Sequence, residues 1–126
     1  MTPSQAVRVI LRGWEQSDPD MIAAVFAEDG IFDDPLQPRR RIGPGDIREA
    51  CAGGIAAIRE CHIPIHSLIE SGDTAFAEGE FRSVLASTGA RFDFPFVLVV
   101  EMKDGKVARL AEYFDTHPLK AGAKPD

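Results

Sequence analysis

The sequence predicts an α+β domain in which three N-terminal helices pack against a curved, mostly antiparallel sheet. Apolar residues recur at helical spacing in residues 2–26 and 44–58, whereas from residue 62 onward they alternate with polar residues as in half-buried strands. Short turn signals separate the later segments, so consecutive strands should pair as antiparallel hairpins. Helices followed by strands in this order are typical of α+β domains, and a strongly bent sheet leaves an apolar pocket open at one end.

Three helices are expected. The first begins after Thr2, with a capping box completed by Gln5, and its apolar stripe is Val7, Ile10, Leu11 and Trp14. The second begins at the cap signal of residues 18–20 and should extend to Phe26. The third begins at Pro44, a residue tolerated in the first turn of a helix.

Five strands are expected, at residues 31–34, 62–68, 74–86, 91–102 and 106–115. The last two should be joined by a hairpin turn at residues 103–105, because Asp-Gly favours such turns. Between the first strand and the third helix, residues 35–45 are rich in Pro, Gly and Arg, which predicts a loop at the rim of the pocket.

Composition limits the class of protein. A chain of 126 residues with a hydrophobic share of 44% can build one core without metal or disulfide support. We assign residues 1–118 to this single domain and residues 119–126 to a flexible polar tail. The net charge of -6 argues against a nucleic-acid partner. The basic cluster at residues 39–41 is interpreted as a solvated loop, with a lid that contacts an anionic ligand as the alternative.

The expected location is the cytoplasm. The N-terminus has no signal-peptide pattern, and Cys51 and Cys61 are expected to be free thiols. The longest apolar run, residues 94–100, is too short to span a membrane. His62 and His66 would lie about 13 Å apart on a strand, too far to share a metal, so neither a metal nor a cofactor is expected.

Asp34 is the first candidate for chemistry. It ends a short strand, follows the aromatic Phe32, and is held by Pro35. A carboxylate fixed beside apolar side chains can have its pKa raised toward neutral pH and act as a general base. The alternative is a turn residue that caps the start of a loop, as Asp-Pro often does.

Asp115 is the second candidate, at the end of the last strand. Tyr113 alternates in phase with it, so both should face the same side of the sheet. If that side is the pocket, Asp115 is the partner acid of Asp34 and Tyr113 can donate a hydrogen bond to a substrate oxygen. The alternatives are a strand-end cap or an ion pair with Arg109 for Asp115, and a half-buried core position for Tyr113.

Aromatic residues on several elements are expected to line the pocket for an apolar ligand. They are Trp14, Phe32, Phe81, Phe94 and Phe96. The alternative for each is a core position without ligand contact. Asp93 lies among the phenylalanines of the strand expected at residues 91–102 and is expected to face outward.

Several motifs resemble the nuclear transport factor 2-like superfamily. They are Phe26-Ala27-Glu28-Asp29-Gly30, Phe32-Asp33-Asp34-Pro35, Ile42-Gly43, the segment from Glu101 to Val107, and Glu112-Tyr113-Phe114-Asp115. Within it the chain is similar to the SnoaL-like branch, which includes polyketide cyclases, ketosteroid isomerases and limonene-epoxide hydrolases. The resemblance implies a cone-shaped sheet around the helices, an apolar pocket, and a homodimer formed through the outer face of the sheet. The fold hosts many chemistries, so it does not name a reaction.

The resemblance also implies roles for individual residues. Asp34 matches the general base of the ketosteroid isomerases, but the two oxyanion-hole positions of those enzymes hold Ile10 and Val97 here. Asp115 matches the final acid of the epoxide hydrolases and the acid/base residue of the cyclases. Where the hydrolases carry an Arg and a second Asp, this chain has a glycine at position 79 and a phenylalanine at position 81.

The expected function is a cofactor-independent acid–base enzyme of the isomerase, cyclase or dehydratase type. Its substrate would be a small apolar carbonyl, polyketide or steroid-like molecule. One alternative is a limonene-epoxide-hydrolase-like hydrolase. Another is a non-catalytic module for small-molecule binding or dimerisation.

Overall fold

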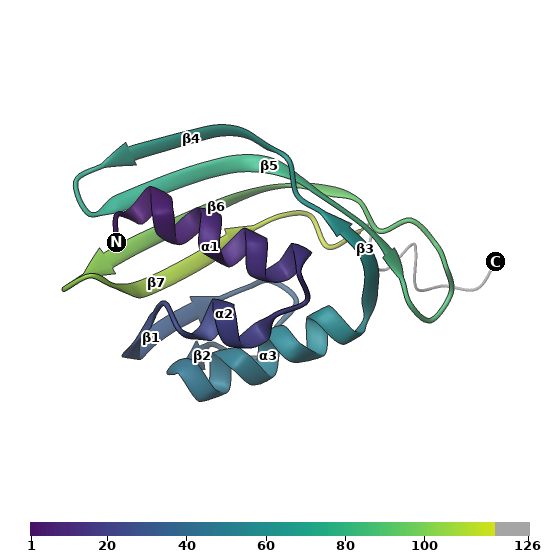
Figure 1. Ribbon diagram of the computed structural model, residues 1–126. Helices are drawn as coiled ribbons and strands as arrows, with labels where there is room; N and C mark the ends of the chain where they lie inside the picture. The colour runs from purple at the N-terminus through teal and green to yellow at the C-terminus, as the bar shows by residue number, and fades with distance from the viewer. Residues whose placement is uncertain (118–126) are drawn as a thin grey trace.

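The computed structural model describes residues 1–117 and shows a seven-stranded sheet that curls into a half-barrel around three helices (Figure 1). The elements in chain order are α1 (Pro3–Glu15), α2 (Pro19–Ala23), β1 (Phe26–Asp33), β2 (Arg41–Ile42), α3 (Pro44–Ala56), β3 (Ile58–His62), β4 (Ile65–Ser71), β5 (Thr74–Leu85), β6 (Phe94–Lys103) and β7 (Lys106–Tyr113). This arrangement confirms the predicted α+β class and the cone-shaped sheet. The predicted tail at residues 119–126 lies outside the described residues.

The helices begin where the cap signals predicted. The Thr2 hydroxyl accepts a hydrogen bond from the Gln5 N–H at 3.1 Å, and the Thr2 N–H donates to Gln5 Oε1 at 2.8 Å, which is a complete capping box. The second helix is shorter than expected. It ends at Ala23, and Phe26 opens β1 instead of closing the helix, because this segment is recruited into the sheet beside Val107 of β7.

The strand order is β2-β1-β7-β6-β5-β3, with β4 also paired to β5. All pairs are antiparallel except β1 with β7, which run parallel. The chain therefore places its first long strand directly beside its last. This pairing fixes the residues that follow β1 against those near the end of β7.

Several strands differ from the predictions, among them the first, which begins at Phe26 and not at residue 31. The strand expected at residues 62–68 is two strands, because Pro64 has no N–H to donate and restricts the residue before it. The strand expected from residue 91 begins at Phe94, and Arg91 forms only an isolated bridge with Val84. The short β2 was not expected at all; it pairs through Ile42 with Ile31 inside the predicted loop.

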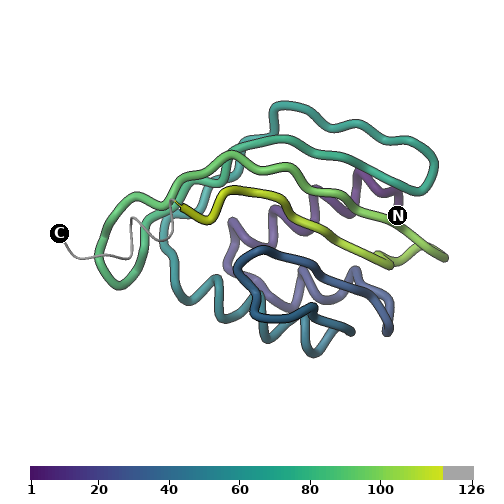
Figure 2. Tube along the Cα trace, turned by 180° about the vertical axis from the view of Figure 1, so that it is seen from behind, coloured from purple at the N-terminus to yellow at the C-terminus, as the bar shows by residue number. Residues whose placement is uncertain are grey.

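The three helices lie on the concave side of the sheet, and the convex side carries no element of the described chain (Figures 1 and 2). Seen from behind in Figure 2, the strands lie in front of α1. Side chains of the helices and of the concave sheet face form one core, whose largest fully buried members include Ile10, Ile22, Ile47, Leu98 and Leu110. Over residues 1–117, no helix has the length and hydropathy needed to cross a membrane.

Candidate active site

An apolar cavity of about 90 Å³ lies between the C-terminal part of α1, α3 and the concave face of the sheet. Six of its lining residues are aromatic: Trp14, Phe81, Phe92, Phe94, Phe96 and Phe114. Leu36, from the loop after β1, also lines it. A cavity of this lining favours an apolar ligand.

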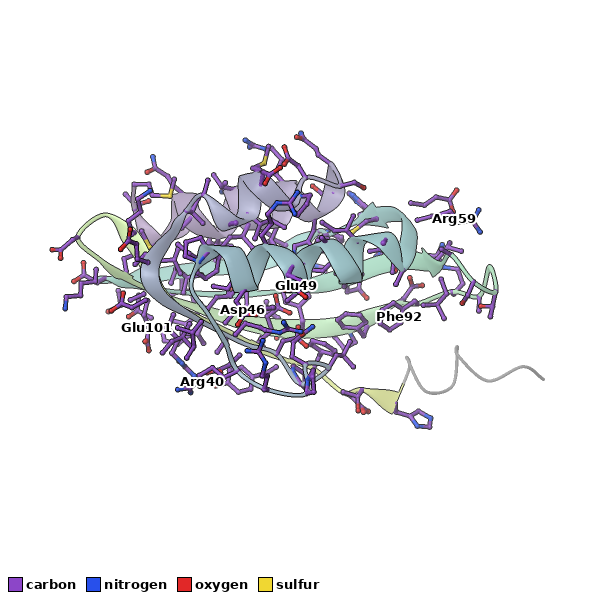
Figure 3. The ribbon with its side chains drawn as sticks, turned by 90° about the horizontal axis from the view of Figure 1, so that it is seen from below. Arg40, Asp46, Glu49, Arg59, Phe92 and Glu101 are labelled. Carbon is purple, nitrogen blue, oxygen red and sulfur yellow. The ribbon has the colours of Figure 1, made fainter. Side chains whose placement is uncertain are left out.

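The rings pack against one another in defined geometries. Phe94 stacks on Phe81 with centroids 4.9 Å apart and on Phe114 at 4.3 Å, while Trp14 meets Phe81 edge-on at 6.0 Å. Phe92, labelled in Figure 3, contacts the Phe94 ring at 5.0 Å. Gly54 of α3 leaves room for the indole, because a Cβ there would lie 2.6 Å from Trp14 Cη2. The aromatic wall is thus fixed from both the helices and the sheet.

Four of the five aromatic residues expected in the pocket line the cavity: Trp14, Phe81, Phe94 and Phe96. Phe32 does not. Its side chain is 2% exposed and belongs to the core, where it lies opposite Leu110 in the β1–β7 ladder. Phe32 is in phase with Asp34 and so lies on the same face of the sheet, but its ring packs in the hydrophobic core and is not part of the cavity wall.

Two carboxyl groups, those of Asp34 and Glu112, face this cavity. Their meeting follows from sheet register. Asp33 pairs with Ala111 in the parallel β1–β7 ladder, so the next residues along each chain, Asp34 and Glu112, are neighbours. Glu112 also lies opposite Leu98 of β6, whose side chain is buried in the core. They are the only acidic side chains that line the cavity among the residues the structure describes.

The electrostatics of this pair favour the protonated form of Glu112. Burial of its carboxyl, then the negative charge of Asp34, then the hydrogen bond between the two groups raise the pKa of Glu112 well above its usual value. Although the residue as a whole is only half-buried, protein surrounds its carboxyl group. Two carboxyl groups can hydrogen-bond only when one is protonated. The Leu36 N–H donates to Asp34 Oδ1 at 2.7 Å and orients the acceptor.

Asp115 does not face the cavity, so the expected pairing of Asp34 with Asp115 is wrong. Asp115 is exposed, and its Oδ1 accepts a hydrogen bond from the His117 N–H at 2.9 Å, which is the cap-like alternative. Tyr113 lies on the convex side of the sheet, away from the cavity, and is 55% exposed. Its hydroxyl accepts a 3.4 Å hydrogen bond from Arg109.

Glu112 is the functional candidate that sequence reasoning missed. The signal was present in the alternation of β7, because Leu110 and Phe114 are apolar and in phase with Glu112, whereas Tyr113 and Asp115 are out of phase. An acid in phase with two large apolar residues indicates a carboxyl group directed at the core or a cavity.

The loop after β1 is tied down by ion pairs on the outside of the site. Arg40 binds Asp33 at 2.8 Å through a two-pronged contact, and Arg109 reaches the same carboxylate at 3.4 Å. These contacts, chiefly the hydrogen bond from Arg40, hold the pKa of Asp33 below its usual value. Arg39 and Arg41 both bind Asp46 of α3. The basic cluster is therefore an ion-paired loop, more ordered than the solvated loop predicted.

The two predicted strand histidines contact different carboxylates. His62 Nδ1 lies 3.2 Å from Glu15, and His66 Nε2 lies 3.6 Å from Glu80. Asp93 faces outward as expected: it is exposed and accepts hydrogen bonds from Arg91. Within residues 1–117, no three His, Cys, Asp or Glu side chains gather as a metal ion would require.

Solved structures with the same fold come from several bacteria. A hypothetical protein with a ketosteroid isomerase-like fold from Catenulispora acidiphila, in complex with trimethylamine, is 20% identical, with a TM-score of 0.86 over 98% of this chain and 94% of that chain. A putative isomerase from Bacillus subtilis is 18% identical, with a TM-score of 0.84 over 95% and 91%. An LEH-like epoxide hydrolase of M. tuberculosis is 19% identical, with a TM-score of 0.76 over 94% and 86%.

The TM-scores show that the fold is shared, whereas the low sequence identities leave the reaction open. No curated protein matches the chain. A family model described as a SnoaL-like domain matches residues 7–110, which is most of the chain and includes all elements from α1 to the middle of β7. This protein therefore belongs to the SnoaL-like domain family.

Proposed function

We propose that this protein is a cofactor-independent enzyme that moves a proton within a small apolar molecule carrying a carbonyl group. The observation that carries the proposal is the Asp34–Glu112 pair in an aromatic-lined cavity. Neighbouring carboxyl groups that differ in protonation supply a base and an acid at one place, which is the requirement of isomerisation, aldol-type cyclisation and dehydration.

The two carboxyl groups take complementary roles in this mechanism. Asp34 accepts the proton from the carbon next to the carbonyl, as the family resemblance suggests for this position. Glu112 in its protonated form turns its O–H from Asp34 to the carbonyl oxygen when substrate binds, and this hydrogen bond stabilises the negative charge that develops there. The apolar wall excludes water, so both interactions are stronger than they would be in solvent.

The dimensions of the cavity indicate what the substrate looks like. A volume of about 90 Å³ is smaller than that of the apolar cavity of roughly 150 Å³ known to bind benzene, so it limits the ligand to a small molecule unless the wall moves. A larger polyketide or steroid-like substrate requires Leu36 to move outward, since this residue lines the cavity from a loop and is 38% exposed. We therefore propose that the loop at residues 35–40 is the entry route.

The limonene-epoxide-hydrolase alternative is less well supported by these contacts. At the two positions where that arrangement needs a cation and an acid, Gly79 has no side chain and Phe81 contributes a ring to the cavity wall. A binding module without chemistry would need the aromatic wall but not the buried carboxyl pair. Burial of two acids costs free energy, which favours a role for them beyond packing.

We also propose that the protein forms a homodimer through the convex face of the sheet. Large apolar side chains are exposed there in adjacent strands, paired in register as Ile69 with Phe76 and Val97 with Tyr113. Covering such a patch is favourable. A sedimentation coefficient of a monomer at high protein concentration would contradict this proposal.

A reducing compartment such as the cytoplasm suits the two cysteines. Both are free thiols, one buried and one half-buried. Burial raises the pKa of Cys51 and of Cys61 to about 12, so neither is a reactive thiolate.

Deuterium exchange tests the proposed proton transfer whatever the net reaction is. A panel of small cyclic ketones is incubated with the protein in D₂O, and NMR follows loss of the protons next to the carbonyl. Wild type should accelerate exchange of at least one ketone, and Asp34→Asn should lower that rate by about 100-fold or more. Asp115→Asn is the matched control and should exchange at the wild-type rate, because Asp115 is exposed and outside the cavity. Equal rates for wild type and Asp34→Asn would remove Asp34 as the base.

A further inference from the structure

A second depression in the described chain lies between α1 and β4 and differs from the cavity in its chemistry. This groove has a volume of about 510 Å³. Its residues are Arg8, Leu11, Arg12, Glu15, Ile63, Ile65, His66, Ser67 and Leu68. The polar members come from one face of the helix and from an edge strand, because β4 pairs with β5 alone.

The two arginines of the groove stand apart from the rest of the chain. Acidic residues outnumber basic ones, so most arginines can find a carboxylate, and seven of the ten form ion pairs. Within the described part of the chain, the three arginines without a carboxylate at ion-pair distance are Arg8, Arg12 and Arg59. Arg8 and Arg12 line the same groove. In a protein with a net charge of -6, two such cations in one concave site are a local excess of positive charge.

Helix geometry places these two cations side by side. Arg8 and Arg12 are four residues apart in α1, about one turn, so their side chains lie on one helix face. Like charges at this spacing repel each other in the free protein. A bound anion between them turns this repulsion into two charge-assisted hydrogen-bonding interactions.

The one carboxylate that lines the groove is already engaged. Glu15 Oε2 accepts a hydrogen bond from the Ile63 N–H at 2.8 Å and lies 3.2 Å from His62 Nδ1. It therefore fastens the end of α1 to the segment between β3 and β4. On the opposite wall, the exposed Ser67 adds a hydroxyl donor, whereas His66 Nε2 lies 3.6 Å from Glu80.

We propose that this groove binds an oxyanion, the phosphate or carboxylate group of a small molecule, between the guanidinium groups of Arg8 and Arg12. The guanidinium fork matches the geometry of both anions. Ser67 donates a further hydrogen bond from the strand side. This site is independent of the proposed proton transfer, since it shares no acidic residue with the cavity.

The groove nevertheless borders the cavity. Leu11 and Ile63 line both spaces, and each is at most 6% exposed. An anion held by Arg8 and Arg12 is thus separated from the aromatic wall by single side chains. Ligand occupancy of the groove should be detected at Leu11 and Ile63 as well as at the arginines.

NMR titration of the full chain tests the proposal. Sodium phosphate and, separately, sodium acetate are added at constant ionic strength maintained with NaCl, while the Arg Nε–H signals and the backbone amides of β4 are followed. Saturable changes at Arg8, Arg12 and Ser67 are expected with at least one salt. Saturation with phosphate alone identifies a phosphate group as the ligand, and saturation with acetate alone identifies a carboxylate.

Two variants make the assignment specific. R8Q/R12Q should weaken the apparent affinity by about tenfold or more, because it removes both charged donors. R59Q is the matched control and should bind as wild type does, since Arg59 is also without an ion pair but lies on β3 outside the groove (Figure 3). Changes that do not saturate with either salt, or that saturate equally in R8Q/R12Q, would overturn the proposal.

Discussion

Asp33 and Asp34 are adjacent in the chain and lie on opposite faces of the sheet. The Asp33 carboxylate is outside, in a cluster with Arg40 and Arg109, and its pKa is lowered. The Asp34 carboxyl is inside, in a cavity lined by six aromatic residues, and the other acid of that cavity is Glu112, whose pKa is raised. One step along the backbone therefore exchanges a cationic environment for an apolar one.

The contrast shows that the sheet faces determine what an acid can do. On the convex face, arginines stabilise a fixed negative charge that has no reason to bind a proton near neutral pH. On the concave face, burial and a second carboxyl keep a proton within the site. The same residue type thus forms ion pairs on one side and, in the proposed mechanism, takes part in acid–base chemistry on the other.

The two faces of the sheet should differ most in how much stability is lost when an aromatic side chain is replaced by alanine. Phe94→Ala removes a ring that is 7% exposed and stacked on two others, so the free energy of unfolding should fall by about 3–5 kcal/mol. Phe76→Ala, on the convex face at 45% exposure, is the control and should cost less than about 1 kcal/mol at low protein concentration. Urea denaturation measures both. Equal losses would show that the cavity wall is not a packed part of the core.

Glu112→Gln should have a smaller and pH-dependent effect. The raised pKa of Glu112 means that the folded protein binds this proton more tightly than the unfolded chain does, so its stability falls as pH rises above the unfolded value near 4.3. The amide keeps a donor for Asp34 without ionising. Glu112→Gln should therefore be more stable than wild type by about 1–3 kcal/mol at pH 8 and equally stable at pH 3.

Thermal denaturation between pH 3 and pH 8 measures this difference. The control is Glu78→Gln, at an exposed position of the convex face, which should follow wild type at every pH. A difference between Glu112→Gln and wild type that stays constant with pH would contradict a protonated Glu112.

Asp33→Asn should have the smallest effect and the opposite pH dependence. Because its pKa is lowered in the folded state, Asp33 contributes stability above the unfolded value near 3.9, and this contribution is lost as pH falls through the folded value. The variant should lose about 0.5–1 kcal/mol at pH 7, less at high salt, and nothing at pH 2. Denaturation in low and high NaCl tests this; a loss that does not depend on salt would mean that the Arg40 contact is not the cause.

Much of the fold was predictable because local signals agreed with tertiary structure. The cap of α1 by Thr2, the proline at the start of α3 and the Asp104-Gly105 turn each specify a boundary by backbone chemistry alone. Asp34 fits both of its interpretations, because it lines the cavity and also caps the turn by accepting a hydrogen bond from the Leu36 N–H. Errors occurred where pairing partners decided the outcome, as for Phe26 and the unexpected β2.

The partner of Asp34 was not predictable from the family resemblance. Asp115 matches the family pattern at the end of β7, yet its carboxylate caps the backbone outside the cavity. Which acid meets Asp34 depends on the register between β1 and β7, where Asp33 pairs with Ala111. Register of a parallel pair is set by contacts remote in sequence, so no local pattern carries it.

The parallel pairing of β1 with β7 also has a consequence for how the protein is made. Asp34 lies early in the chain, whereas Glu112 lies almost at the end of the described residues. The two acids can therefore meet only after nearly the whole domain has been synthesised. Contacts of this sequence separation close late and slow folding. A nascent or C-terminally shortened chain lacking β7 therefore exposes the edge of β1 and has no carboxyl pair, so the site and the completed sheet arise together.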